Sequence, residues 1–129
     1  MASFGKDIEE AVETVIGCLP SQAPVDARHL QAFMRRVVAY LEGEGVVFDK
    51  DGIIGLTSHI ANFVVRARAG VEVDYPSGFE DQVPEGDRIL GRAVGKMVTD
   101  EEGMQVPAPE ILLIASHLAA MRIRREQGW

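Results

Sequence analysis

The chain has 129 residues, of which 47% are hydrophobic and 26% charged, a composition typical of one globular domain and not of a disordered segment. Its formal net charge at pH 7 is −7, and its only basic cluster is Arg122, Arg124 and Arg125. Because nucleic-acid binding needs clustered cations that neutralise phosphates, we expect no direct contact with DNA or RNA.

The single cysteine, Cys18, excludes an intrachain disulfide and a thiolate-rich metal site. It lies at the apolar end of the first helical segment, where we expect it in the core. The N-terminal stretch MASFGKDIEE lacks the basic start and apolar run of a secretory signal, and the longest strongly apolar run, residues 111–115, is too short to span a bilayer. We therefore expect a cytoplasmic protein with no membrane partner.

Apolar residues recur with helical spacing along nearly the whole chain, which predicts an all-α fold, a compact bundle of about five helices. The first helix is expected to stop at Pro20, and residues 21–24 form a connector. Residues 1–25 are thus interpreted as an N-terminal helix and connector, packed on a helical domain of residues 26–129.

The boundaries of the next two helices are predicted from capping residues. Asp26 is expected to cap the second helix, which ends at Gly43 and Gly45. Asp51 is expected to cap the third, which stops at Gly70.

The second half of the chain begins with an irregular segment, residues 71–86, in which only VEVDY (71–75) shows weak strand alternation. In the fourth helix, GRAVG (91–95) is a pattern of small residues that favours close helix packing. The last helix opens at Pro107 and is apolar on almost all sides from Ile111 to Met121. Such a helix is normally covered all round, so we expect it either at the centre of the bundle or partly against another subunit.

Two of the three histidines lie in apolar helical segments. His59 precedes Arg66 by seven residues, and Glu110 precedes His117 by the same interval. Seven residues turn an α-helix by about 700°, so each pair shares a face, with its members about 10 Å apart along the axis. The third histidine, His29, lies in a polar stretch and is expected to be exposed.

Several roles are open to His59 and His117. Each could be a buried residue with a local hydrogen bond. A neutral imidazole could also accept a phosphoryl group, bind a metal or act as a base. The sequence has no HxxxH or HExxH motif, although a metal site built from His59, His117 and Glu110 stays possible. No GxSxG nucleophile turn is present, and we expect neither an enzyme nor a cofactor.

Taken together, the two histidine stretches resemble the phosphotransferase-system regulation domain (PRD). The stretch LTSHIANFVVRARAG (56–70) is similar to the first signature of that family, in which a histidine precedes an arginine by seven residues and a glycine follows. The stretch VPAPEILLIASHL (106–118) is similar to the second, in which a proline and an acid lead to a second histidine. The resemblance covers about residues 26–125 and implies a compact helical bundle, in a small stand-alone member with one copy of the domain.

The resemblance also implies a function. It makes His59 and His117 phosphoacceptors from phosphocarrier proteins of the sugar phosphotransferase system, with Arg66 and Glu110 as the signature arginine and acid. It implies a homodimer with the histidines at or near the interface, acting in transcriptional or metabolic regulation through dimerisation or partner binding. The alternative is a helical ligand- or metal-binding protein in which His59 and His117 line a pocket without being phosphorylated.

Overall fold

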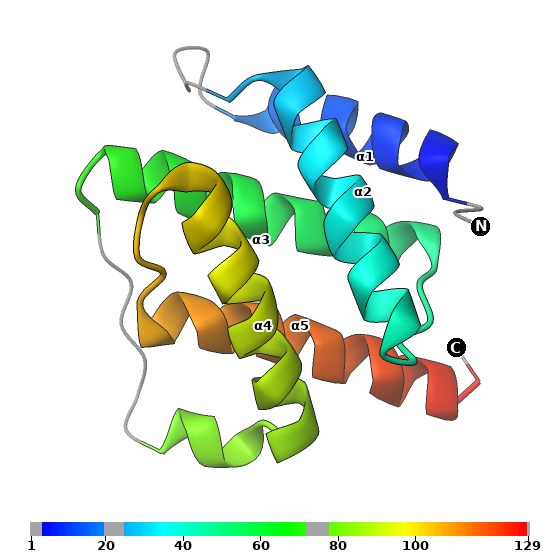
Figure 1. The fold of residues 1–129 in the computed structure, drawn as a ribbon. Coiled ribbons are helices and arrows are strands. Elements are labelled where there is room, and N and C mark those ends of the chain that lie inside the picture. The colour runs from blue at the N-terminus through cyan, green and yellow to red at the C-terminus, as the bar shows by residue number, and fades with distance from the viewer. Residues whose placement is uncertain (1–3, 20–24, 72–77, 129) are drawn as a thin grey trace.

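The computed structural model describes residues 4–19, 25–71 and 78–128, which form a bundle of five α-helices and one short 3₁₀ helix (Figure 1). No strand occurs in these ranges, so the predicted all-α fold is confirmed. Most of the VEVDY stretch lies outside the described residues. In chain order the elements are α1 (Gly5–Cys18), α2 (Ala27–Gly43), α3 (Lys50–Arg68), η1 (Phe79–Gln82), α4 (Glu85–Glu102) and α5 (Ala108–Glu126).

Helix α3 lies at the centre of the bundle, where it contacts α1, α2 and α5. Its buried residues therefore cover a wide arc of the helix rather than one stripe. Thr57 is among them, and its hydroxyl donates to the carbonyl of Ile53 at 2.7 Å, so that no polar group is left unsatisfied there. The buried side chains of α3 are Ile53, Leu56, Thr57, Ile60, Ala61, Phe63 and Val64.

Helix α5 is not the central helix, although its sequence is the most evenly apolar. It packs against α3 and α4, which leaves Leu112 and Leu113 half-buried and Ile123 43% exposed. Helix α3 instead contacts three helices, and its Gly52 and Gly55 leave room for the side chains of Met121 and His117 of α5. Cover of α5 by another subunit stays a prediction. None of the described helices has an apolar run long enough to cross a lipid bilayer.

The contact between α4 and α5 depends on the two glycines of the GRAVG stretch. A Cβ atom on Gly91 would lie 2.8 Å from the Cβ of Ala115 and 3.1 Å from the carbonyl oxygen of Ile111. One on Gly95 would lie 3.0 Å from Cγ1 of Ile111. The two carbon–carbon distances, 2.8 and 3.0 Å, are shorter than ordinary contacts between carbon atoms, so the prediction of close helix packing at this stretch is confirmed.

The N-terminal caps of α2 and α3 test two predictions made from the sequence, of which one is correct and one is wrong. The side chain of Asp26 caps α2 by accepting from the backbone N–H of Arg28 at 3.1 Å, as predicted. For α3 the prediction of Asp51 is wrong, because the cap is Asp49, whose Oδ1 accepts from the N–H of Gly52 at 2.6 Å. Asp51 lies in the first turn of the helix, where a negative charge suits the helix dipole.

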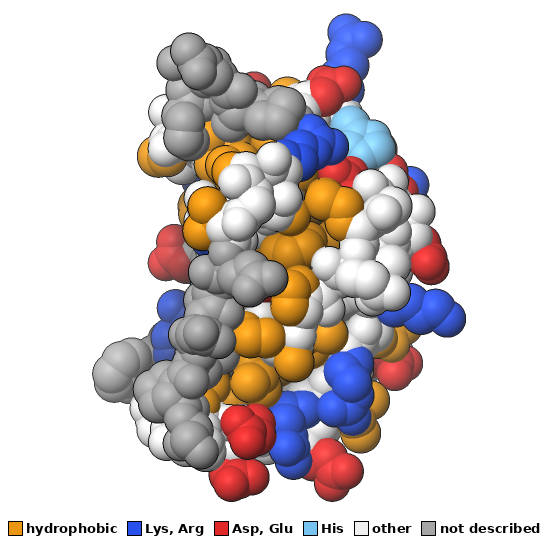
Figure 2. Space-filling model, turned by 90° about the vertical axis from the view of Figure 1, so that its left-hand side faces the viewer, with side chains coloured by type: hydrophobic (Ala, Val, Ile, Leu, Met, Phe, Trp, Pro, Cys, Tyr) orange, Lys and Arg blue, Asp and Glu red, His pale blue; other side chains and the backbone are white. Residues whose placement is uncertain are grey.

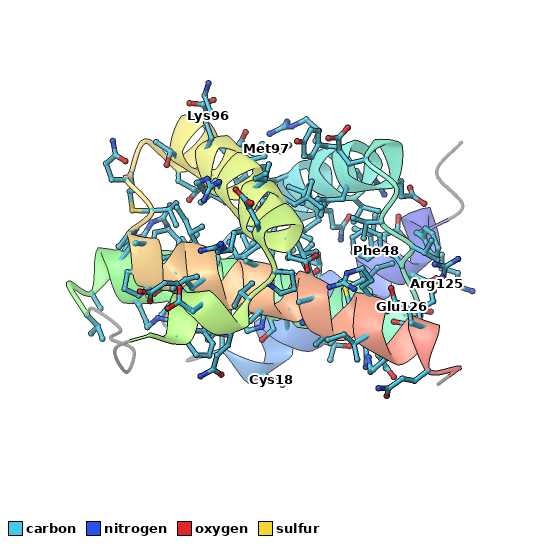
Figure 3. The ribbon with its side chains drawn as sticks, turned by 90° about the horizontal axis from the view of Figure 1, so that it is seen from below. Cys18, Phe48, Lys96, Met97, Arg125 and Glu126 are labelled. Atoms are coloured by element: carbon cyan, nitrogen blue, oxygen red, sulfur yellow. The ribbon has the colours of Figure 1, made fainter. Side chains whose placement is uncertain are left out.

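The prediction of Cys18 in the core is also wrong. Cys18 is exposed at the last residue of α1, on the outer side of that helix (Figure 3). The fully buried residues of α1 end at Val15, and beyond it Ile16 and Leu19, rather than Cys18, pack partly against the core.

Candidate functional site

The site is formed by α3 and α5, which run antiparallel beside each other (Figure 1). In such a pair, seven residues forward along α3 correspond to seven residues backward along α5. The equal spacing in the two helices therefore places His59 beside His117 and Arg66 beside Glu110. We call these contacts the histidine layer and the ion-pair layer. All four residues that the sequence singled out are brought together.

In the histidine layer, the ring centroids of His59 and His117 lie 5.2 Å apart with an interplanar angle of 66°, an edge-to-face contact. Nε2 of His117 lies 2.9 Å from the carbonyl oxygen of Gly52. Because a carbonyl only accepts, Nε2 must carry the proton and donate it, which leaves the lone pair on Nδ1. The ring of His59 has no hydrogen bond to a residue that the structure describes.

Room for the histidine layer depends on Gly55. A Cβ atom at this position would lie 2.1 Å from Cε1 and 2.9 Å from Nε2 of His117, closer than atoms in contact can come. The ring of His117 thus occupies the space that a side chain at residue 55 would take. This glycine lies about one turn before His59 on α3, and no spacing rule in the sequence marks it.

Both rings are held in the neutral form. The pKa of His59 is lowered to about 4, mainly by burial and in smaller part by the nearby His117 and Arg66, while the negative charge of Glu110 acts in the opposite direction. Burial also lowers the pKa of His117, against the hydrogen bond to Gly52. At neutral pH each imidazole therefore keeps a free lone pair, the form that acts as a nucleophile.

The ion-pair layer holds a buried carboxylate. Glu110 is only 4% exposed, and Arg66 donates to it twice, from Nε at 3.0 Å and from Nη2 at 2.7 Å. Arg66 is itself 27% exposed, so one side of the guanidinium still meets solvent. This bidentate geometry is the strongest form of an arginine–carboxylate contact, and burial of a carboxylate is costly without such a partner.

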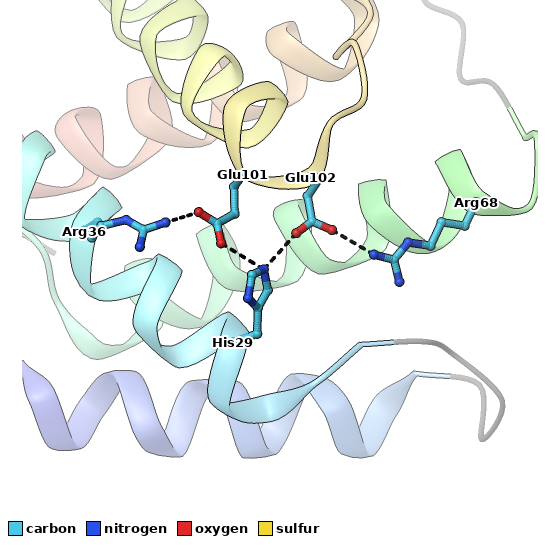
Figure 4. Close-up of polar contacts among 5 residues, drawn as sticks. All are labelled: His29, Arg36, Arg68, Glu101 and Glu102. Carbon is cyan, nitrogen blue, oxygen red and sulfur yellow. Dashed lines mark hydrogen bonds and ion pairs between the residues drawn. The ribbon is translucent and has the colours of Figure 1, made fainter.

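A second polar cluster, which the sequence did not reveal, joins the end of α4 to α2 and α3 (Figure 4). We call it the α4 latch. Nε2 of His29 lies 3.0 Å from a carboxylate oxygen of both Glu101 and Glu102. Arg36 donates to Glu101, and Arg68 donates to Glu102 at 3.0 Å. His29 is 49% exposed, as expected, but it contacts two acids rather than only solvent.

No local motif marks the α4 latch, because His29 and Glu102 are 73 positions apart in the chain. The only sequence feature that could indicate the latch is the acidic run at residues 100–102, which is equally typical of a solvent-exposed helix end. Beside the latch lies a cavity of about 340 Å³ with an apolar floor. Its floor is formed by Leu30, Phe33, Ile60, Ala61 and Val64, and its rim by Val25, Asp26, His29, Arg68 and Glu102.

Within the described ranges, no three histidine, cysteine, aspartate or glutamate side chains are arranged to hold a metal ion. The fold and the site define a five-helix bundle with a pair of neutral histidines between its central and last helices. Comparison with family models, with curated proteins and with solved structures finds no match to this chain.

Proposed function

We propose that the chain is a non-enzymatic regulatory module of the sugar phosphotransferase system, in which the histidine layer receives a phosphoryl group from a phosphocarrier protein. The observation that supports this most is the contact between His59 and His117, two neutral imidazoles with ring centroids 5.2 Å apart. Neutral imidazole is the nucleophilic form that phosphoryl transfer requires. The charge of Arg66 already acts on His59, so its guanidinium would also attract the incoming phosphate.

His59 is the better candidate for the first acceptor. Its ring has no hydrogen bond to a described residue, whereas the ring of His117 is fixed by its bond to Gly52. A nitrogen lone pair of His59 attacks the phosphorus, a new P–N bond forms, and the bond from phosphorus to the donor breaks with its electron pair going to the donor. No cofactor is needed for this exchange.

The phosphoryl group would act as a switch through Arg66. It adds about 1.5 to 2 negative charges and strong acceptor oxygens, which compete with Glu110 for the guanidinium. If Arg66 turns towards the phosphate, Glu110 is left buried without its partner. The contact between α3 and α5 then weakens, and a change of a few kcal/mol is enough to shift dimerisation or partner binding.

The test is a phosphotransfer assay with the purified chain, phosphoenolpyruvate and the general phosphotransfer proteins. We expect an acid-labile, base-stable phosphate on the wild type and its loss in His59→Gln. His29→Gln is the matched control, because His29 belongs to the α4 latch, and it should be labelled like the wild type. An unlabelled wild type, beside full transfer to a known acceptor protein, would refute the proposal.

A further inference from the structure

A hollow of about 400 Å³ lies between η1, α4 and the start of α5, away from the histidine layer. Figure 2 shows this side of the molecule, with a hydrophobic patch and basic side chains at its lower border. The hollow is lined by Glu80, Arg88, Arg92, Ala108, Ile111 and Leu112.

Two guanidinium groups face this hollow from successive turns of α4. Arg88 and Arg92 are four residues apart and so lie on one face of the helix. Neither forms an ion pair with a residue that the structure describes, and Nε of Arg88 is buried without a hydrogen-bond partner. A buried donor without an acceptor is destabilising, so an acceptor that reaches Nε of Arg88 is stabilising.

This pair of cations is unusual in so acidic a chain, which has 20 acidic and 13 basic residues. Most other arginines are matched to carboxylates, as Arg66 is to Glu110 and Arg122 to Asp87. Among the residues that the structure describes, Glu80 is the one acid that lines the hollow, so this part of the lining carries two positive charges against one negative. The charge therefore favours an anion.

The opposite wall of the hollow is apolar, formed by Ala108, Ile111 and Leu112 of α5. A volume of about 400 Å³ falls in the range of small-molecule sites, about 300–1,000 Å³. A planar anionic group suits the forked donors of Arg88 and Arg92, while a hydrocarbon body would cover Ile111 and Leu112.

We propose that this hollow binds a small organic carboxylate with an apolar body. The carboxylate contacts Arg88 and Arg92, and the hydrocarbon packs on Ile111 and Leu112. The hollow shares no lining residue with the histidine layer, so ligand binding to it can be measured on the unphosphorylated chain.

The test uses titration calorimetry of the full chain with octanoate, together with octanol as a neutral isostere. We expect octanoate to bind and octanol to bind about tenfold more weakly or not at all, a difference of about 1.4 kcal/mol. The double variant Arg88→Gln/Arg92→Gln should lose at least about tenfold in octanoate affinity. Leu112→Asp should lose binding as well, because it places a charge against the hydrocarbon.

Two controls separate this site from the rest of the surface. Arg125→Gln removes an exposed cation at the far end of α5, next to a different cavity, and should bind octanoate like the wild type. His59→Gln should also bind normally, which keeps the test independent of the phosphotransfer proposal. The inference is overturned by equal affinity for octanol and octanoate, by unchanged affinity in the double arginine variant, or by binding of an acidic peptide with no binding of octanoate at millimolar concentration.

Discussion

Replacing Gly55 by alanine should destabilise the protein, even though alanine is the better helix former. The new Cβ would lie 2.1 Å from Cε1 and 3.0 Å from Nδ1 of His117. The ring cannot turn away freely, because it is bonded to the carbonyl of Gly52 at 2.9 Å and packs on His59. Relief of the clash therefore requires loss of that hydrogen bond or a shift of α5.

The two opposing effects can be compared in free energy of unfolding. Alanine in place of glycine gains about 0.4–1 kcal/mol where the backbone is already helical. Overpacking of a close contact costs about 1–3 kcal/mol, and loss of the hydrogen bond of His117 about 0.5–1.5 kcal/mol more. The cost of the clash is larger than the gain from replacing glycine in a helix, and the expected net loss in free energy of unfolding is about 2 kcal/mol.

Urea unfolding followed by circular dichroism measures this loss against two controls. Gly86→Ala lies in α4 with nothing within 4 Å of the new Cβ, so it should be neutral or stabilising. Gly55→Ala made in a His117→Ala background should also cost nothing, because the ring that it strikes has gone. The reasoning is refuted if Gly55→Ala is as stable as Gly86→Ala, or if its cost is the same with and without the ring.

Two further predictions concern the charges of the site. Arg66→Leu should lower the free energy of unfolding by about 3 kcal/mol, at the low end for a broken buried pair because Arg66 is 27% exposed, and Arg66→Leu/Glu110→Leu should recover most of the loss. Wild-type stability of the single variant in urea would contradict this. The pKa of His59 is lowered to about 4 in the folded state, so below about pH 6.5 the unfolded chain binds a proton at this residue more readily than the folded chain does. The free energy of unfolding is therefore highest above pH 6.5 and falls towards pH 4 by as much as about 3 kcal/mol. His59→Gln should flatten the fall between pH 6.5 and 4, and an equal slope in both proteins would speak against a buried neutral His59.

The helices were predictable because their apolar stripes are local. The stripe of α2, from Leu30 to Leu41, is buried as its spacing indicated. The residue that caps α3 was not predictable, since Asp49 and Asp51 give the same capping signal in the sequence. The choice between them follows from Phe48, which is 5% exposed in the core and so fixes Asp49, the next residue, as the entry to the helix (Figure 3).

The candidate site was predictable within each helix but not between helices. The seven-residue intervals from His59 to Arg66 and from Glu110 to His117 are visible in the sequence. Their pairing depends on the antiparallel alignment of α3 with α5, which is a tertiary contact. The space that Gly55 leaves for a ring likewise appears only when the two helices are packed.

The burial of Glu110 has a consequence for the alignment of the two helices. If α5 slipped by seven residues along α3 in one direction, Glu110 would face the neutral ring of His59 and Arg66 would lie beyond the first residue of α5, Ala108. In the other direction Glu110 would lie beyond the last residue of α3, Arg68. Apolar contacts repeat along both helices and would tolerate either slip, whereas only the observed alignment matches a buried carboxylate with a guanidinium. The pair therefore selects one register for α5 on α3, a role in structural specificity that is distinct from its contribution to stability.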